Sequence, residues 1–179
     1  AGDRVIFADE DLLPLLEPLL DKIPTVEKII ICRHGEGGET TFSDAEDYEA
    51  LIQDQPTQYA WPDIDEHAPM GLCYTSGTTG KPKGVMYTHR STYLHTINQA
   101  MTDAMNLSAL DAVCGTVPMF HAMGWGVPFT ASMLGCKQVM PHLFMDPERL
   151  LQLMCDEEVT LSAGVPTIWQ GVKTVLENN

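Results

Sequence analysis

Short β-branched runs alternate with helix-forming segments along the chain, and this alternation is the feature that most restricts its fold. Strands are expected at 4–8 and 26–32, with a leucine-rich helix at 11–22 between them. A loop at 34–41 precedes a helix that we expect to begin with a capping box at Ser43–Glu46 and to continue through Gln53. The order predicts an α/β fold with a doubly wound, mostly parallel sheet flanked by helices.

The same pattern resumes after residues 55–69, a polar stretch with three prolines that indicates a surface connection. Thr88 is expected to N-cap a helix that runs to about Asn106. The apolar stripe of this helix would consist of Leu94, Ile97, Met101, Ala104 and Met105. Other strands are expected at 68–75, 85–87, 112–117, 137–140 and 159–162, and other helices at 125–134, 147–156 and 167–176. We therefore divide the chain into a strand–helix portion at 1–67 and a second portion of the same larger domain at 68–179.

Composition excludes several classes of protein. With 179 residues, 44% hydrophobic and 20% charged, the chain has the size and character of one ordinary globular domain. No apolar run is long enough to cross a bilayer. The five cysteines are scattered and form no CxxC pair, which argues against a structural metal and favours a reduced, cytoplasmic compartment. The net charge of −15 argues against nucleic acid or an anionic membrane as partner.

The few cations are unevenly distributed. No Lys or Arg occurs between His34 and Gly80, whereas four cations face only two acids between His67 and Met145. Two of these four, Lys81 and Lys83, lie beside a glycine-rich segment. The arrangement indicates an anion site, although charge counting alone leaves chance clustering equally open.

The glycine-rich segment, Tyr74–Gly84, reads YTSGTTGKPKG and has the composition that a phosphate chain requires. Hydroxyl groups and main-chain N–H groups supply donors, glycines allow close approach of the backbone, and lysines supply positive charge. The alternative is an ordinary exposed turn, which this ordered combination of residues makes the weaker interpretation.

Pro82 distinguishes this segment from the common GxxxxGK[ST] phosphate loop, which leads into a helix. Proline disfavours helix at the preceding residue, so the segment should lead into a second strand. Gly77 and Gly80 are also separated by only two residues. Both features argue against a phosphate-loop NTPase.

Tyr74–Gly84 closely resembles the phosphate-binding motif of the adenylate-forming superfamily, which includes acyl-CoA synthetases, luciferases and peptide-synthetase adenylation domains. Val117–His121 resembles the next core motif of that family, and Ala163–Thr167 resembles a segment that lines its acyl pocket. Residues 118–125 and 135–139 are most similar to fatty-acyl-CoA ligases of medium or long chain preference. The resemblance covers nearly everything after Ala68 and is weaker before it.

The resemblance implies an enzyme that uses ATP, Mg²⁺ and coenzyme A to convert a carboxylate into an acyl-CoA through an acyl-adenylate. The phosphate-binding residues it implies are Thr75, Ser76, Gly77, Thr78, Thr79, Gly80, Lys81 and Lys83, with Thr75 also a Mg²⁺ ligand. His121 would be the catalytic residue beside the acyl carbon. The acyl and adenylate pocket would include Ala122, Trp125, Gly164, Val165 and Pro166.

Each pocket residue also has a purely structural interpretation. His121 would be a packed core histidine, Trp125 a packed core aromatic, and Gly164–Pro166 a strand-to-helix turn. Gly124 and Gly126 on either side of Trp125 leave it freedom to swing, which favours a gate over packing. Trp61 and Trp169 are expected to be structural.

Later motifs of the family do not occur in the sequence. The glutamate-bearing YGxTE segment, the ribose-binding aspartate motif and the adenylating lysine of the small C-terminal domain are missing. The resemblance thus implies an incomplete piece of a larger multi-subdomain enzyme, inactive alone, which in related fatty-acyl ligases is often a homodimer. Alternatives are an aryl-acid ligase, a carrier-loading adenylation domain, or a non-catalytic ATP-binding module.

Overall fold

The computed structural model describes residues 2–33, 45–77, 80–142 and 145–178. The chain divides into two compact units, Ala1–Pro62 and Asp63–Asn179, and each is considered by itself. The division lies within the polar connection between α2 and β4, which contains no helix or strand and is exposed from residue 53 to residue 67. The expected surface connection is therefore confirmed, whereas the assignment of both portions to one larger domain stays a prediction.

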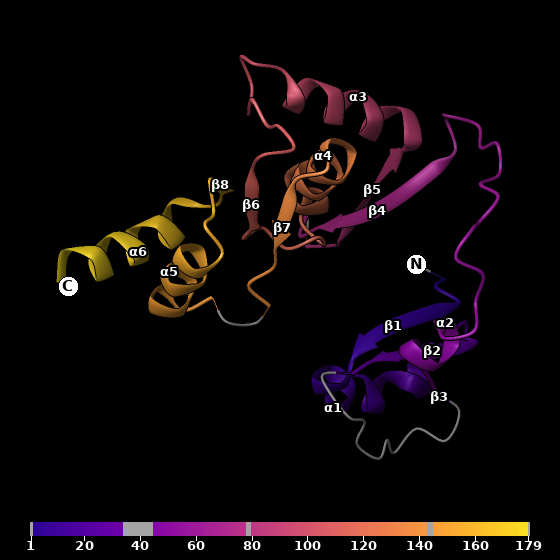
Figure 1. Ribbon diagram of the computed structural model, residues 1–179. Helices are drawn as coiled ribbons and strands as arrows, with labels where there is room; N and C mark the ends of the chain where they lie inside the picture. Colours follow the sequence, from indigo (N-terminus) through magenta and orange to yellow (C-terminus); the bar gives the residue numbers. More distant parts are fainter. Residues whose placement is uncertain (1, 34–44, 78–79, 143–144, 179) are drawn as a thin grey trace. The chain divides into compact units, whose positions relative to one another are not determined.

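The first unit contains a parallel three-stranded sheet in the order β1-β2-β3 (Figure 1). Strands β1 (Val5–Asp9) and β2 (Lys28–Cys32) match the two expected strands to within two residues, and β3 is Ala45–Asp47. In β2 the isoleucine side chains at positions 30 and 31 are both buried, which is the pattern of a strand covered on its two faces.

Two helices of this unit differ from the sequence prediction. The expected helix at 11–22 is broken into η1 (Glu10–Leu12), α1 (Leu13–Leu16) and η2 (Glu17–Lys22), because Pro14 and Pro18 cannot donate backbone hydrogen bonds. The helix expected to begin at Ser43 is shorter and begins later, as α2 (Tyr48–Ile52), because residues 45–47 form a strand that pairs with β2. Its N-cap is Asp47, whose Oδ1 accepts from the Ala50 N–H at 3.0 Å. Ser43, Asp44 and the loop expected at 34–41 lie outside the described residues.

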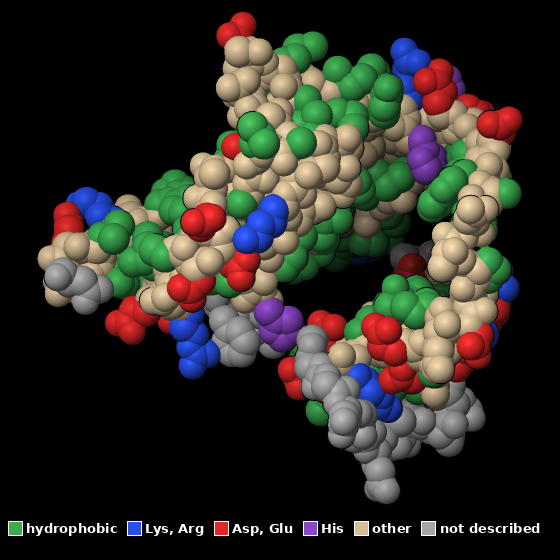
Figure 2. Space-filling model, viewed as in Figure 1, with side chains coloured by type: hydrophobic (Ala, Val, Ile, Leu, Met, Phe, Trp, Pro, Cys, Tyr) green, Lys and Arg blue, Asp and Glu red, His purple; other side chains and the backbone are tan. Residues whose placement is uncertain are grey.

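The second unit begins with an antiparallel hairpin, β4 (Pro69–Thr75) and β5 (Lys83–Thr88). Helix α3 (His89–Ala100) follows directly and is N-capped by Thr88, whose side chain accepts from the Ser91 N–H at 3.1 Å. The expected capping residue is thus confirmed, but the helix ends about six residues earlier than expected. Its predicted apolar stripe is wrong, because α3 buries Thr96 and Gln99 while Leu94 and Met101 are exposed. Figure 2 shows exposed hydrophobic side chains over this helix.

A parallel sheet in the order β7-β6-β8 forms the centre of the second unit. Its strands are β6 (Ala112–Gly115), β7 (Lys137–Val139) and β8 (Leu161–Ala163). The helices that accompany them are η3 (Ala122–Gly126), α4 (Val127–Leu134), α5 (Pro147–Asp156) and α6 (Pro166–Asn178). The limits of α5 are those that the sequence predicted, with Asp146 as N-cap and Pro147 as first residue.

Helices cover both faces of this sheet. Val113 packs in a cluster with Val127 and Ala131 of α4, whereas the next residue, Cys114, packs with Leu150 of α5 and Val172 of α6. Successive residues of a strand point to opposite faces, so the two clusters lie on opposite sides of β6. The α/β, doubly wound and mostly parallel prediction is confirmed, with the strands distributed over three small sheets. None of the described helices has the length and apolar character needed to span a membrane.

Candidate functional site

The glycine-rich segment Tyr74–Gly84, predicted to bind phosphate and here called the phosphate loop, connects the two strands of the β4–β5 hairpin. Thr75 is the last residue of β4 and pairs with Lys83, the first residue of β5. The expectation that Pro82 directs the loop into a strand is therefore confirmed. Gly80 donates its N–H to the Gly77 carbonyl at 3.3 Å, which closes a tight turn. Thr78 and Thr79 lie outside the described residues.

Gly77 is required by the geometry of this loop. Its φ is +61°, a left-handed conformation that glycine adopts without steric cost. A Cβ at this position would collide with the backbone carbonyl of Lys81. The loop can therefore bend back on itself only with glycine here.

The loop presents hydroxyl and ammonium groups to solvent. Thr75, Ser76, Lys81 and Lys83 are all exposed. Among the residues that the structure describes, seven of the ten Lys and Arg side chains form ion pairs with carboxylates; Lys22, Lys81 and Lys83 do not. Two of these three unpaired cations thus belong to the loop, where an anionic ligand can pair with them.

The next predicted site residues, His121, Ala122 and Trp125, belong to an unusual turn after β6. Five consecutive residues, 122–126, have positive φ angles between 46° and 75°. This segment, here called the 122–126 turn, is one turn of left-handed helix, and three of its residues are not glycine. A left-handed conformation costs roughly 1–2 kcal/mol for each such residue, so surrounding contacts must hold the turn in place.

Hydrogen bonds hold the turn from both ends. At its start, His121 donates its N–H to the Pro118 carbonyl and accepts the Gly124 N–H, both at 3.0 Å. At its end, the Gln99 side-chain amide donates to the Trp125 carbonyl at 2.7 Å. His121 itself is exposed, so the alternative of a packed core histidine is wrong.

A pocket of about 530 Å³ lies between α3, the 122–126 turn and α4, and we call it the α3–turn pocket. Ala122 and Trp125, both predicted from the sequence, belong to its lining. The full lining is Tyr87, Ser91, Thr92, His95, Gln99, Met105, Ala122, Met123, Trp125, Gly126 and Phe129. The volume falls in the range of small-molecule sites, and the wall combines apolar and hydrogen-bonding side chains.

The predicted segment Gly164–Pro166 is not part of that lining. It is attached to the residues that follow β6. The Thr116 hydroxyl donates to the Ala163 carbonyl at 2.7 Å, and the Trp169 indole N–H donates to the Gly164 carbonyl at 3.1 Å. A Cβ on residue 164 would lie 2.5 Å from the Thr116 hydroxyl oxygen, so only glycine allows this approach. Val165 and Pro166 follow as the exposed entry to α6.

Contacts within the second unit bring the three predicted segments together. Met123 of the 122–126 turn packs against Gly71 of β4, and the Cys73 sulfur lies 3.9 Å from the Met119 carbonyl oxygen. Thr116, just after β6, bonds the end of β8. The turn therefore contacts the hairpin that carries the phosphate loop, and the 163–166 segment is bound to Thr116 at the carboxyl end of β6, where ligands of α/β proteins commonly bind.

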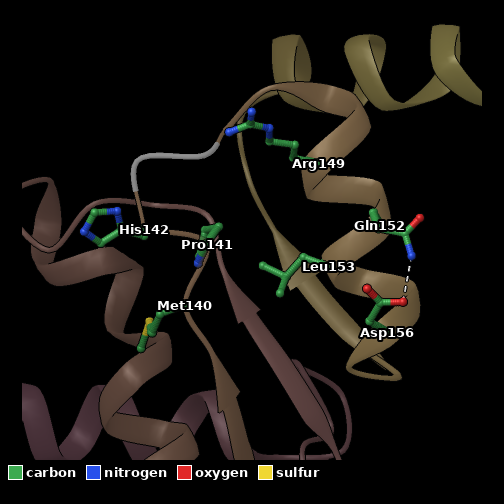
Figure 3. Close-up of a pocket in the computed structure, with 7 residues that line it drawn as sticks. All are labelled: Met140, Pro141, His142, Arg149, Gln152, Leu153 and Asp156. Carbon is green, nitrogen blue, oxygen red and sulfur yellow. Dashed lines mark hydrogen bonds between the residues drawn. The ribbon is translucent and has the colours of Figure 1, made fainter. Parts of the chain in front are cut away.

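A second cavity, of about 360 Å³, contains none of the predicted site residues (Figure 3). It lies between the segment after β7 and helix α5. Its lining is Met140, Pro141, His142, Arg149, Gln152, Leu153 and Asp156. On α5, the Gln152 side-chain amide donates to the Asp156 carboxylate one turn further along at 2.7 Å. No motif in the sequence points to this cavity.

Sequence reasoning missed several residues that shape the site. Gln99 and Thr130 are buried polar side chains behind the turn, and Thr116 and Trp169 fix the 163–166 segment. No signal in the sequence pointed to Gln99, which lies off the apolar stripe predicted for its helix. Trp169 was expected to be structural, and its hydrogen bond to Gly164 agrees with that role.

The chain belongs to the AMP-binding enzyme family, whose model matches residues 1–179. It is 41% identical over 180 residues to a medium-chain-fatty-acid–CoA ligase from Ectopseudomonas oleovorans, covering 100% of this chain and 33% of the relative. It is 37% identical to a long-chain-fatty-acid–CoA ligase from Thermus thermophilus, covering 99% of this chain and 31% of the relative. The chain thus spans about a third of the length of these curated relatives.

Solved structures share the fold. A long-chain-fatty-acid-CoA ligase from Archaeoglobus fulgidus superposes with a TM-score of 0.81 at 24% identity, covering 99% of this chain and 33% of that chain. An anthranilate CoA ligase in complex with anthranoyl-AMP gives a TM-score of 0.82 at 23% identity, covering 94% of this chain and 32% of that chain. The predicted resemblance to the adenylate-forming superfamily is confirmed at the level of family and fold.

Proposed function

We propose that this chain is part of an ATP-dependent, AMP-forming ligase that activates a medium- or long-chain fatty acid and transfers it to coenzyme A. The observation that carries this proposal is the junction of two features in one compact unit. The hairpin that carries the phosphate loop and its two unpaired lysines contacts, through Gly71, the turn whose Trp125 and Ala122 line a pocket of about 530 Å³. The names of the two ligases to which the chain is 41% and 37% identical support the fatty-acid substrate.

In the proposed first step, a carboxylate oxygen attacks the α-phosphorus of ATP, and pyrophosphate leaves with the bonding electron pair. The phosphate loop would hold the β- and γ-phosphates so that charge on the leaving group is neutralised. Among the described residues, the donors would be the exposed side chains of Thr75, Ser76, Lys81 and Lys83. Thr78 and Thr79 would add two hydroxyl groups, as the family motif implies, and Gly77 and Gly80 would let the backbone approach the phosphates.

The residues present fit a magnesium ion that is bound chiefly by the nucleotide. Mg²⁺ prefers oxygen ligands and usually keeps several waters together with substrate phosphates. Thr75 offers one exposed hydroxyl at the end of β4. No cluster of three or more His, Cys, Asp or Glu side chains suited to a metal occurs in the part of the chain that the structure describes. When bound, the ion would neutralise phosphate charge.

In the proposed second step, the sulfur of coenzyme A attacks the acyl carbon of the adenylate, and AMP leaves. We propose that His121, exposed at the start of the 122–126 turn, lies beside that acyl carbon. Ala122 would contact the adenylate, and Trp125 would gate the acyl tunnel. Gly164, Val165 and Pro166 would form a further part of the acyl wall. The buried thiols of Cys114 and Cys136 are unsuited to act as nucleophiles, because burial raises the pKa of each.

We also propose a cytoplasmic location and a homodimeric state for the whole protein. All five cysteines are free, as expected in a reducing compartment. A sedimentation velocity profile that shows only monomer at micromolar concentration would refute the dimer.

The decisive experiment measures pyrophosphate release by the protein that carries this chain, with MgATP, coenzyme A and carboxylic acids from acetate to palmitate. We expect release that depends on the acid, increases toward medium or long chains, and is matched by acyl-CoA. Release with aryl or amino acids alone would keep the adenylation and reject the fatty-acid substrate. ATP binding without release for any acid would leave a non-catalytic nucleotide-binding protein.

A further inference from the structure

Two buried polar side chains stand behind the 122–126 turn. Thr130 of α4 has no solvent exposure, and Gln99 of α3 is 9% exposed. Neither residue belongs to a family motif in the sequence, and both occupy positions between packed helices where apolar side chains would be expected. Buried polar groups are retained when their hydrogen bonds are satisfied, so their partners reveal what they do.

The hydrogen bonds form a relay that ends on the turn. The Thr130 hydroxyl donates to the Gln99 side-chain oxygen at 2.7 Å, which leaves the Gln99 amide to donate to the Trp125 carbonyl at 2.7 Å. Thr130 also lies 3.3 Å from the Gly126 carbonyl oxygen. We call this arrangement of Gln99 and Thr130 the clamp. Because Thr130 fills the acceptor of the amide, the orientation of Gln99 is fixed with its donor toward Trp125.

The clamp holds a segment whose backbone conformation is unfavourable by itself. Residues 122–126 all have positive φ, which is sterically unfavourable for Ala122, Met123 and Trp125. A Cβ at Gly126 would lie 2.5 Å from the His95 imidazole, so α3 also fits closely against the end of the turn. Without the donor from Gln99 the Trp125 carbonyl loses its partner, and the backbone is then free to relax toward a right-handed turn.

Relaxation of the turn would change the pocket, because Gln99, Trp125 and Gly126 all line it. We infer that Gln99 and Thr130 are positioning residues that set the orientation of Trp125, and thereby the acyl-chain specificity of the α3–turn pocket. This inference rests on the proposed function for the identity of the acyl ligand. The phosphate loop has no hydrogen bond to either residue within the described chain, so the clamp acts on the acid and not on ATP.

The test compares Thr130→Val with Thr130→Ser in the whole protein that carries this chain. Valine keeps the shape of threonine and loses the hydroxyl, whereas serine keeps the hydroxyl. Thr96→Val is the matched control, because Thr96 is a buried threonine on α3 whose hydroxyl bonds only the Thr92 carbonyl of its own helix, at 2.8 Å. Each variant is assayed for the KM of octanoate, palmitate and ATP by pyrophosphate release.

We expect Thr130→Val to lower kcat/KM for the preferred acid on the order of 10- to 100-fold and to change the octanoate-to-palmitate ratio. The KM for ATP should stay within about twofold, and Thr130→Ser and Thr96→Val should resemble the unsubstituted protein. A Thr130→Val protein with unchanged acid KM and unchanged chain-length ratio would overturn the inference. A purely structural role of Thr130 predicts equal losses of kcat/KM with every acid and with ATP. Such equal losses would also overturn the inference.

A second measurement does not depend on turnover. Acrylamide quenching of Trp125 is obtained as the difference between each variant and its Trp125→Phe counterpart. We expect stronger quenching in Thr130→Val, and unchanged quenching would overturn the clamp. If the unsubstituted protein shows no acid-dependent turnover, the proposed function fails while quenching still decides whether the clamp orients Trp125. Should Thr130→Val not fold, Gln99→Met removes both hydrogen bonds at similar side-chain length and is subjected to the same assays.

Discussion

The phosphate loop and the 122–126 turn both carry predicted site residues, but different parts of the chain hold them in place. The loop is closed by its own residues, since Gly80 bonds Gly77 and the flanking strands pair with each other. The turn depends on Gln99, which is 26 positions away from Trp125 along the chain. The contacts that close the loop can be read from its own motif, whereas the distant contact that holds the turn cannot be read from the motif around Trp125.

Among the variants that test this comparison, we expect the largest effect from a substitution in the phosphate loop. Replacement Gly77→Ala would place a Cβ against the Lys81 carbonyl at a φ of +61°. Because the loop would have to open, we expect on the order of a 100-fold loss of kcat/KM for ATP in acid-dependent pyrophosphate release. Gly135→Ala is the control, since its φ is also positive, +75°, in open space, but it lies outside the loop. Equal losses in the two variants would mean that the close approach at Gly77 is unimportant.

Substitutions in the 122–126 turn should mainly lower the free energy of unfolding. Gly126→Ala meets both a φ of +75° and the His95 imidazole, so we expect a loss of roughly 2–3 kcal/mol in the free energy of unfolding. Gly135→Ala has the same φ of 75° with nothing within 4 Å, and it should cost only about 1 kcal/mol. Urea denaturation of both variants measures the difference. Similar costs would show that α3 yields easily to the added methyl group.

A substitution that loosens the 163–166 segment from α6 should have a smaller effect on stability, because Trp169 is the side chain of α6 that bonds it. Trp169→Phe removes the indole donor to the Gly164 carbonyl while keeping an aromatic ring, and we expect a loss of about 1 kcal/mol. Trp61→Phe serves as the control, since Trp61 is 85% exposed and should change stability by less than about 0.5 kcal/mol. Thermal unfolding followed by circular dichroism compares them. A larger effect of Trp61→Phe would contradict this assignment.

The smallest effect concerns Asp111, which precedes β6 at the end of the sheet remote from the site. Hydrogen bonds from the Ser108 backbone N–H, and then from the Thr160 and Ser108 hydroxyls, hold the pKa of this carboxyl below its ordinary value. A lowered folded-state pKa gives stability that is present above the unfolded-state pKa, about 3.9, and is lost as pH falls through the folded value.

The stability difference between the unsubstituted protein and Asp111→Asn should therefore be largest near pH 6 and shrink as the pH falls from about 5 toward 3. Urea titrations at several pH values measure it. Thr160→Val, which removes only one of the donors, should show the same trend with smaller amplitude. Asp111→Asn should leave the acid KM unchanged. A difference that grows on acidification would reverse the assigned direction of the pKa shift.

Local rules explain which elements the sequence predicted well. The strand after the loop followed from Pro82, and the expected helix at 147–156 coincides with α5, whose start is fixed locally by Asp146 and Pro147. Elements that depend on tertiary partners were predicted poorly. Residues 45–47 were expected in a helix but pair with β2, and α3 turns a polar face toward α4 because Gln99 and Thr130 bond each other there. The left-handed conformation of Ala122, Met123 and Trp125 has no local signal, since none of these residues favours it.

Adjacent residues of β6 serve two different cores, Val113 on the α4 side and Cys114 on the α5 and α6 side. Side chains alternate between faces, so inserting or deleting one residue in this strand would exchange the occupants of both cores at once. Substitutions in β6 can be absorbed one side at a time, but a change in its length cannot. Among homologues, this strand should therefore vary in composition and keep a fixed number of residues, while length changes collect in the exposed connection at residues 53–67.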